Sequence, residues 1–175
     1  PPPPTPPHNI FFLMIRRPPR STRIECRRQR QMCIRDRART ALCVPFHDLD
    51  PTGMVWHGRY FKYFETARCE LLERIGYSYA DMKDSGYIWP VVDTQIRYVH
   101  SLTLDQAIQV TACLKEWEFR MTMDYLIEDE TGRVCTRAST VQVPVLAETM
   151  ELQLGSPPVF TDKVTSLMRK LTHGQ

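Results

Sequence analysis

The segment from Phe46 to Glu65 constrains the fold of this chain more than any other. It holds two aspartates, a histidine, a proline-glycine turn and the start of an amphipathic helix. The apolar run Ala41 to Phe46 before it is predicted to be a strand. Asp50-Pro51-Thr52-Gly53 is predicted to be a turn, because proline presets φ and glycine takes conformations closed to other residues. Since no other segment concentrates reactive groups in this way, we take it as the candidate active site.

A long helix is predicted over residues 57–75. Apolar residues recur along it at intervals of three and four positions, while charged residues fill the opposite face. Gly76 is a natural stop for this helix. One side is therefore expected to be buried, formed by Tyr60, Phe64, Ala67, Leu71 and Ile75, with Tyr63 and Leu72 widening the stripe.

The entrance of this helix is suited to acyl-transfer chemistry. A helix N-terminus presents unpaired backbone N–H groups and the positive end of the helix dipole, which can polarise a carbonyl or hold a developing oxyanion. Asp50 precedes His57 by seven residues, so it lies within loop reach of that entrance. A carboxylate beside an oxyanion site is the minimum equipment for acyl transfer.

The run Asp-x-Asp-Pro-x-Gly-x-Val-Trp-His-Gly-x-Tyr-x-x-Tyr-Phe-Glu-x-Ala-Arg, from Asp48 to Arg68, resembles the signature of the 4-hydroxybenzoyl-CoA thioesterase family of hot-dog enzymes. It also resembles the related Tol-Pal-associated group, and the likeness spans roughly residues 41–147. The resemblance implies that Asp50 acts as nucleophile or general base. It further implies that the backbone amide of His57 or Gly58 polarises the thioester carbonyl. Arg59 departs from the pattern, since many relatives carry a small polar residue there, which predicts a different entrance to the acyl pocket.

From Ile88 onward, apolar residues recur at every second position instead of at the three- and four-residue intervals of a helix. Residues 88–98, 108–115, 119–128 and 134–145 alternate apolar and polar side chains, and the residues from Asp129 to Gly132 form a hairpin turn signal. One strand, one long helix and four strands define an α+β domain, in which the helix packs on a curved antiparallel sheet of about five strands. The hot-dog family has the same order. Its members form homodimers or homotetramers with the acyl channel between subunits, which resolves the exposed sheet edge.

Five further residues are candidates for supporting or substrate-binding roles: Asp48, Tyr60, Glu65, Trp89 and Arg97. For Asp48 a structural hydrogen bond within the loop is favoured over a second base, and for Tyr60 a place in the core is favoured over the acyl pocket. Glu65 falls among the inward aromatics Phe61 and Phe64, and it either forms a buried carboxylate or a salt bridge to Arg68, or supports catalysis. Trp89 either lines the acyl pocket or packs in the core. Arg97 either binds a phosphate of coenzyme A or, as favoured, occupies a solvated strand end.

The two main candidates also have structural alternatives. Asp50 on its own is typical of a residue that forms a turn before proline, and only the long motif favours catalysis. The side chain of His57 either caps the helix or donates a hydrogen bond to the substrate. In the remaining alternative the side chain has no role, and only the backbone N–H of His57 takes part.

Charge is distributed unevenly along the chain. Residues 1–39 hold ten arginines against Glu25 and Asp36, a balance of +8, so the net charge of +3 leaves −5 on the remainder. A body of that sign does not suggest a nucleic-acid binder. The six cysteines form no Cys-x-x-Cys pair and have no histidine at zinc spacing, so neither a metal site nor a disulfide framework is predicted. No apolar run approaches the roughly 20 residues of a membrane helix.

Three segments are assigned from these patterns. Residues 1–39 are expected to be a disordered basic, proline-rich segment, because nothing there can bury an apolar face. Parts of it, residues 11–22 and 31–37, resemble translated sequencing-adapter read-through, so the segment is predicted to be an artefact; a basic nucleic-acid or membrane arm is the alternative. Residues 40–147 form the hot-dog domain, and residues 148–175 form an extension with a short helix over 160–171.

The expected function is hydrolysis of an acyl-CoA or acyl-carrier-protein thioester in the cytoplasm, without membrane insertion, metal or cofactor, coenzyme A being part of the substrate. The alternative is a non-catalytic acyl-CoA-binding module on the same scaffold. A hot-dog dehydratase and a basic nucleic-acid-binding protein are weaker alternatives. The sequence leaves open the acyl group, the choice between covalent and general-base chemistry, and the choice between dimer and tetramer.

Overall fold

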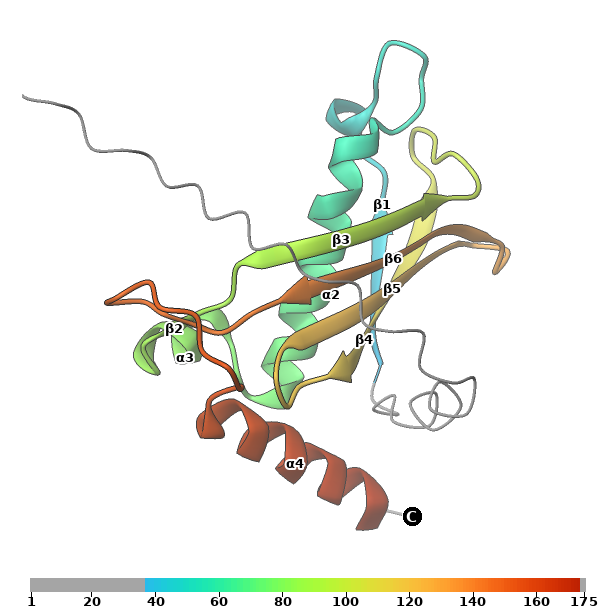
Figure 1. Cartoon of the computed structure of the whole chain (residues 1–175). Helices are drawn as coiled ribbons and strands as arrows, with labels where there is room; N and C mark the ends of the chain where they lie inside the picture. Colours follow the sequence, from blue (N-terminus) through green and yellow to red (C-terminus); the bar gives the residue numbers. More distant parts are fainter. Residues whose placement is uncertain (1–36, 174–175) are drawn as a thin grey trace, which may run out of the picture. The chain divides into compact units, whose positions relative to one another are not determined.

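The computed structural model describes residues 37–173, and the expectations for residues 1–36 lie outside the described residues. Figure 1 shows the arrangement of the described elements. In chain order these elements are β1 (Ala38–Cys43), the 3-10 helices η1 (Phe46–Asp48) and η2 (His57–Arg59), α2 (Tyr60–Ile75), α3 (Tyr79–Asp84), β2 (Tyr87–Ile88), β3 (Val91–Tyr98), β4 (Ala107–Glu116), β5 (Met121–Asp129), β6 (Val134–Gln142), β7 (Val145–Leu146) and α4 (Pro158–His173).

Five strands form one antiparallel sheet in the order β1-β4-β5-β6-β3, and α2 packs across one face of it (Figure 1). The short strands β2 and β7 form a separate antiparallel pair. This is the α+β architecture predicted from the change of apolar period, with one long helix and a sheet of five strands. Because β1 and β3 lie at the two ends of the strand order, each presents an edge of the sheet.

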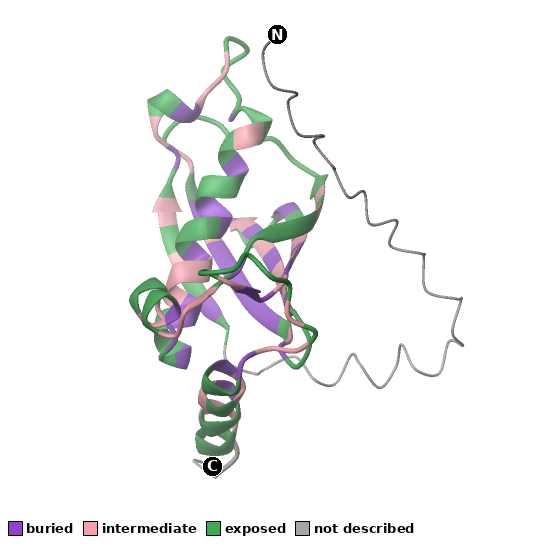
Figure 2. Ribbon diagram, turned by 60° about the vertical axis from the view of Figure 1, so that its left-hand side comes forward, coloured by how far each residue is buried: buried purple, intermediate pink, exposed green. Residues whose placement is uncertain are grey.

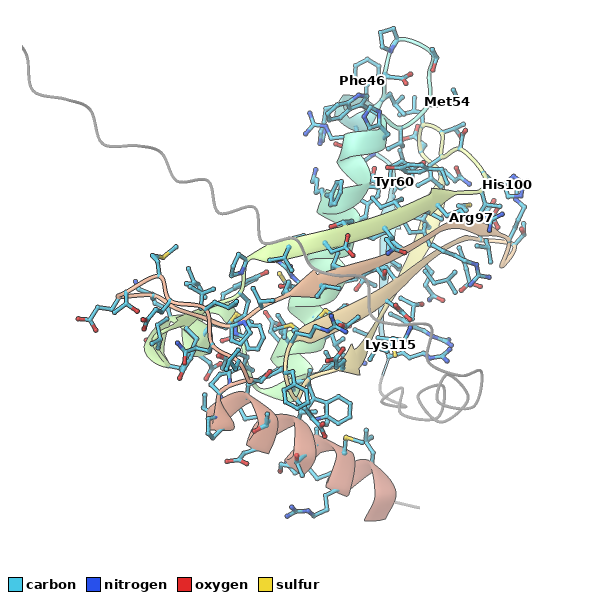
Figure 3. The ribbon with its side chains drawn as sticks, in the orientation of Figure 1. Phe46, Met54, Tyr60, Arg97, His100 and Lys115 are labelled. Atoms are coloured by element: carbon cyan, nitrogen blue, oxygen red, sulfur yellow. The ribbon has the colours of Figure 1, made fainter. Side chains whose placement is uncertain are left out.

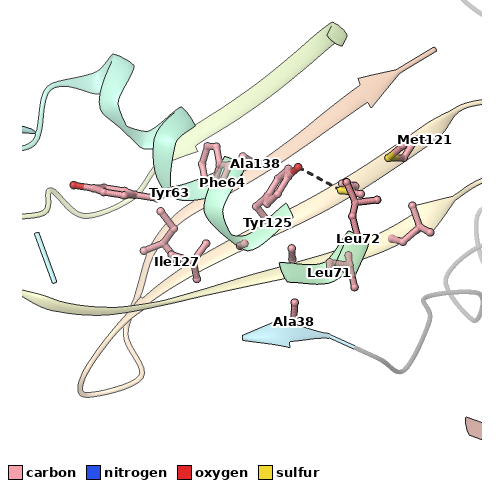
Figure 4. Packing of buried hydrophobic residues seen from close by; sticks show 14 of the residues in the cluster. Ala38, Tyr63, Phe64, Leu71, Leu72, Met121, Tyr125, Ile127 and Ala138 are labelled. Atoms are coloured by element: carbon pink, nitrogen blue, oxygen red, sulfur yellow. Dashed lines mark hydrogen bonds between the residues drawn. The ribbon is translucent and has the colours of Figure 1, made fainter. Parts of the chain in front are cut away.

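The core lies between α2 and the strands that it crosses. Alternate residues of β4 and β5 point toward the helix, as the period of two requires. Phe64 of α2 packs against Tyr125 of β5 with ring centroids 4.9 Å apart (Figure 4). Figure 2 shows the buried residues concentrated where the helix meets the sheet, while α4 is mostly exposed. The buried face of α2 consists of Tyr60, Tyr63, Phe64, Ala67, Leu71, Leu72 and Ile75, as the helical stripe predicted.

Several strand boundaries differ from the prediction. The segment predicted as one strand over 88–98 is divided into β2 and β3, and β5 begins at Met121, not at residue 119. The first strand was predicted over 41–46, but β1 runs from Ala38 to Cys43, so it begins within the segment expected to be disordered. The reason is its partner, since Ala38 pairs with Ala112 of β4 and is fully buried. The last strand was predicted to run to residue 145, but β6 ends at Gln142. Pro144 lacks the N–H that a ladder needs, and the chain then leaves the large sheet as β7.

The C-terminal helix α4 is longer than predicted. Phe160 at its start is fully buried and packs against Tyr77 and Trp89, with ring centroids 5.0 and 5.1 Å away. The Lys163 ammonium donates to the backbone carbonyl of Gly76, just after the end of α2, and lies 3.0 Å from Asp81. This cation therefore complements the carbonyl groups at the C-terminal end of α2.

Candidate active site

The loop between β1 and α2 forms a small hairpin with Asp50 at its tip. The N–H of Asp50 donates to the carbonyl of Met54 over 2.8 Å, and the N–H of Trp56 donates to the carbonyl of Asp48 over 2.9 Å. Gly53 has φ +79°, a left-handed conformation that favours glycine. The predicted Pro-Gly turn is therefore present, and the hairpin ends where η2 begins.

The carboxylate of Asp50 closes this turn. One oxygen, Oδ1, accepts hydrogen bonds from the backbone N–H of Thr52 over 2.8 Å and from its hydroxyl over 2.5 Å. These bonds lower the pKa of Asp50, and the backbone N–H of Met54 and then the imidazole of His57 contribute to the same shift. Because the bonded form is the carboxylate, Asp50 stays ionised at lower pH than an ordinary aspartate. The other oxygen, Oδ2, accepts no hydrogen bond from residues 37–173.

The entrance of the helix carries two unpaired amides. Within the described residues, no acceptor receives a hydrogen bond from the N–H of His57 or of Gly58. The His57 carbonyl accepts a hydrogen bond from the Tyr98 hydroxyl over 3.0 Å, which ties this turn to the end of β3. The Trp56 ring lies over Gly58, since a Cβ added to Gly58 would approach its carbons to 2.2 Å. The absence of a side chain at Gly58 therefore leaves room for the indole of Trp56, and any larger residue at this position would displace the indole.

Asp48, the other aspartate of the loop, is fully buried. Its Oδ2 accepts a hydrogen bond from the Tyr63 hydroxyl of α2 over 2.9 Å. Its Oδ1 accepts none, but it lies 3.6 Å from Arg59 Nε and 3.8 Å from Lys62 Nζ. Burial and the bond to Asp48 raise the pKa of Tyr63, so this hydroxyl remains a donor. Asp48 thus joins the base of the hairpin to the first turns of the helix.

Tyr60 and Glu65, both on α2, lie in different environments. Tyr60 is buried and packs against Tyr98, with ring centroids 4.9 Å apart. Glu65 was predicted to lie among inward aromatics, but it is exposed, because it shares the outer edge of the helix with exposed Phe61. The salt bridge to Arg68, one of the predicted alternatives, is present. The carboxylate of Glu65 pairs with Arg68 over 2.6 Å and accepts a hydrogen bond from the hydroxyl of Tyr79.

Trp89 and Arg97 do not come together with Asp50. Trp89 is buried against Phe160, and its indole N–H donates to the Tyr77 hydroxyl over 3.4 Å. Arg97 precedes Tyr98, whose ring packs toward α2, so its own side chain points to the opposite face of the sheet. The hydrogen bonds and ion pairs therefore place Asp50, His57, Gly58 and Asp48 in the hairpin and first turns at the start of the helix. Figure 3 labels Tyr60 in the first turn of α2, and Arg97 on β3.

Two hollows on the described surface lie away from this group. One, of about 470 Å³, is beside the β5–β6 turn, and the other, of about 570 Å³, is on the open face of the sheet. Neither includes Asp50. Among residues 37–173, no three His, Cys, Asp or Glu side chains converge as metal ligands would. In the same part of the chain, every helix is too short or too polar to span a bilayer.

Sequence reasoning missed two residues that hold the candidate site. Tyr98 anchors His57, and Tyr63 anchors Asp48, yet both were assigned only to apolar stripes. The available signal was the phenolic hydroxyl, since a buried tyrosine usually finds a hydrogen-bond partner. Its partner could not be predicted, because Tyr98 and His57 meet only through tertiary packing.

Comparison with known proteins agrees with the fold. The family model of the thioesterase-like superfamily matches residues 44–166. A candidate esterase of Aquifex aeolicus is 34% identical over 88 residues, which cover 50% of this chain and 69% of that protein. A candidate acyl-CoA thioesterase of Bacillus subtilis is 27% identical over 109 residues, covering 62% of this chain and 79% of that protein.

Solved structures share the same architecture. The DHNA-CoA thioesterase of Staphylococcus aureus superposes with a TM-score of 0.69 at 24% identity, covering 79% of this chain and 95% of that one. An aspartate-to-asparagine mutant of 4-hydroxybenzoyl-CoA thioesterase, complexed with 4-hydroxybenzoyl-CoA, superposes with a TM-score of 0.65 at 18% identity. The match covers 73% of this chain and 98% of that one. These likenesses define the hot-dog fold.

A curved antiparallel sheet wrapped on one long helix is the architecture that this chain shares with these thioesterase structures. The chain belongs to the thioesterase-like superfamily.

Proposed function

We propose that this protein hydrolyses the thioester of an acyl-CoA or an acyl-carrier protein, with Asp50 as the reacting carboxylate. The observation that carries the proposal is the position of Asp50 at the tip of a hairpin that ends at the unpaired amides of His57 and Gly58. Thr52 occupies one carboxylate oxygen and leaves the other free to react. The chemistry needs only this carboxylate, the amides and water, with coenzyme A entering as part of the substrate.

Two routes use the same groups. In the general-base route, Asp50 takes a proton from water while the water oxygen attacks the thioester carbonyl. In the covalent route, Asp50 attacks the carbonyl itself, and water then cleaves the resulting anhydride. In both, the amide of His57 or Gly58 stabilises the oxyanion, and the thiolate leaves and takes up a proton.

We further propose that two copies of the chain form the acyl channel. The edge strand β3 and the hairpin expose apolar side chains that a monomer leaves in water. Val91 and Val92 are 48% and 50% exposed on β3, and Trp56 is 48% exposed beside Gly58. Pairing of two chains along this edge would cover these side chains. The second chain would also form one side of a channel beside Asp50, which lines neither of the two hollows.

The test is the variant Asp50→Asn, assayed by thiol release over a panel of acyl-CoA and acyl-carrier-protein substrates. Asparagine keeps an oxygen that can accept both hydrogen bonds from Thr52, so the turn is retained while the base is lost. We expect kcat to fall by about a thousandfold, the middle of the range for a general base.

The matched control is Asp129→Asn, because Asp129 forms the same kind of turn with Thr131. This variant should keep the wild-type kcat. A wild-type rate in the Asp50 variant on the best substrate would refute the assignment. Saturable acyl-CoA binding without thiol release by the wild type would instead favour the non-catalytic binding module.

A further inference from the structure

The open face of the sheet, opposite α2, carries two arginines directly across from each other. Arg97 of β3 pairs in register with Arg137 of β6, and Gln95 pairs with Ser139 in the same way. All four side chains alternate with residues that point toward α2, so they share the open face. Figure 3 labels Arg97 near one end of β3.

This juxtaposition is unfavourable without a counter-ion, because like charges directly opposite on neighbouring strands destabilise a sheet. Within the described residues, neither Arg97 nor Arg137 forms an ion pair or a side-chain hydrogen bond. Asp124 of β5, which lines the same hollow, pairs with Lys115 instead, over 3.3 Å. Among residues 37–173, the two guanidinium groups therefore remain without a partner.

The arginines line the hollow of about 570 Å³, a volume within the usual range of small-ligand sites. The same hollow is lined by Gln95, Thr111 and Ser139, whose amide and hydroxyl groups can also donate hydrogen bonds. Planar guanidinium groups recognise phosphate oxygens in a bidentate manner, and neighbouring hydroxyls complete such sites.

We propose that Arg97 and Arg137 bind the phosphate group of a phosphorylated ligand on the open face of the sheet. This site lies on the face opposite α2 and the candidate catalytic loop. The bound phosphate would supply the negative charge that the cross-strand pair lacks. Two sources share this chemistry, the 3′-phosphate of a coenzyme A nucleotide and a free phosphorylated metabolite.

The first test measures binding of inorganic phosphate and of 3′,5′-ADP to the full chain by calorimetry and by thermal shift. The variants are Arg97→Gln and Arg137→Gln, and the control is Arg120→Gln, an arginine paired with Glu116 away from the hollow. Each site variant should weaken binding of 3′,5′-ADP about tenfold or more, since a charge-assisted hydrogen bond is lost. The control should bind as the wild type does.

The unliganded proteins give a second readout. Removal of either charge relieves the repulsion, so both site variants should melt at a slightly higher temperature than the wild type without phosphate, and phosphate should stabilise them less. Wild-type binding in both variants, or no saturable binding by the wild type, would overturn the proposal. A changed oligomeric mass in the variants, with no phosphate binding by the wild type, would also overturn it, because the arginines would then contact a second copy.

The source of the phosphate follows from kinetics on acyl-CoA and on the matching dephospho-CoA ester, which lacks the 3′-phosphate. If the nucleotide of the substrate is bound here, the site variants should raise KM for acyl-CoA only. If a free phosphorylated metabolite is bound, KM should stay unchanged for both esters while phosphate binding is still lost. Either result supports the site, and loss of Asp50 activity has no bearing on it.

Discussion

The chain builds one kind of turn twice, at residues 50–53 and at residues 129–132. In each, the aspartate Oδ1 accepts hydrogen bonds from the N–H and the hydroxyl of the threonine two residues later. In each, the glycine at the fourth position has φ +79°. The N–H of each aspartate also donates to the carbonyl four residues further along. The two turns therefore share these hydrogen bonds, and Oδ1 of Asp129 accepts a further one from the N–H of Arg133 over 3.0 Å.

Their surroundings differ. Asp129 ends β5, and its second oxygen pairs with Arg133 over 3.0 Å; the hydrogen bonds from Thr131, with those from Arg133, lower its pKa to about 2. The second oxygen of Asp50 accepts no hydrogen bond from described residues, and the hairpin that carries it leads to the amides of His57 and Gly58. Turn chemistry is thus a local property, whereas reactivity depends on what the tertiary structure places beside the free oxygen.

The largest contrast between the two turns is the one between Asp50→Asn and Asp129→Asn. We expect a loss of about a thousandfold in kcat for the first and none for the second. Both variants should keep the wild-type secondary structure, because asparagine preserves the threonine hydrogen bonds. Circular dichroism at matched concentration checks that the rate difference does not come from misfolding.

A large effect on stability is expected from Asp48→Ala, which changes the base of the hairpin that carries Asp50 and leaves the turn at Asp129 untouched. This change leaves the buried Tyr63 hydroxyl without its acceptor and removes the anion beside Arg59 and Lys62. Loss of one partner of a buried polar cluster should lower the free energy of unfolding by about 3 kcal/mol. Denaturant titration measures it. Asp48→Asn is the control, since its amide oxygen can still accept from Tyr63; equal losses in both variants would show that charge rather than this bond matters.

A smaller and equal effect on stability is expected from Gly53→Ala and Gly132→Ala. A Cβ at either glycine meets no atom within 4 Å, so the cost is only that of the left-handed conformation, about 1 to 2 kcal/mol. Only Gly53→Ala should also reduce kcat, because it shifts the turn that holds Asp50. Matched melts and rates for the pair test this, and a loss of rate in both variants would argue that stability alone controls activity.

The smallest effect concerns pH. The Thr52 hydrogen bonds lower the pKa of Asp50, so the acid limb of kcat/KM should lie below the ordinary aspartate range. Thr52→Val removes the hydroxyl donor, raises the pKa of Asp50 and should move that limb to higher pH. Thr131→Val should leave the limb in place. A profile unchanged by Thr52→Val would mean that Asp50 does not titrate on that limb.

Prediction from sequence succeeded where the signal was local. The period of three and four residues defined the buried face of α2, and the period of two defined β3 to β6, because side-chain direction follows directly from backbone geometry. It failed at Glu65, which a single helical position separates from the buried stripe, and at β1, whose start depends on pairing with β4. Catalysis by Asp50 stays a prediction.

By itself, the sequence determined the long helix with its buried face, the alternating strands, the two Asp-x-Thr-Gly turns and the loop that precedes the long helix, since each depends on neighbouring residues. Only the tertiary structure decided which aspartate is buried, that Tyr98 holds His57, and that Arg97 faces Arg137. These contacts join residues that are far apart along the chain. They depend on strand register and helix packing, which are set by the free energy of the whole core and not by any short segment.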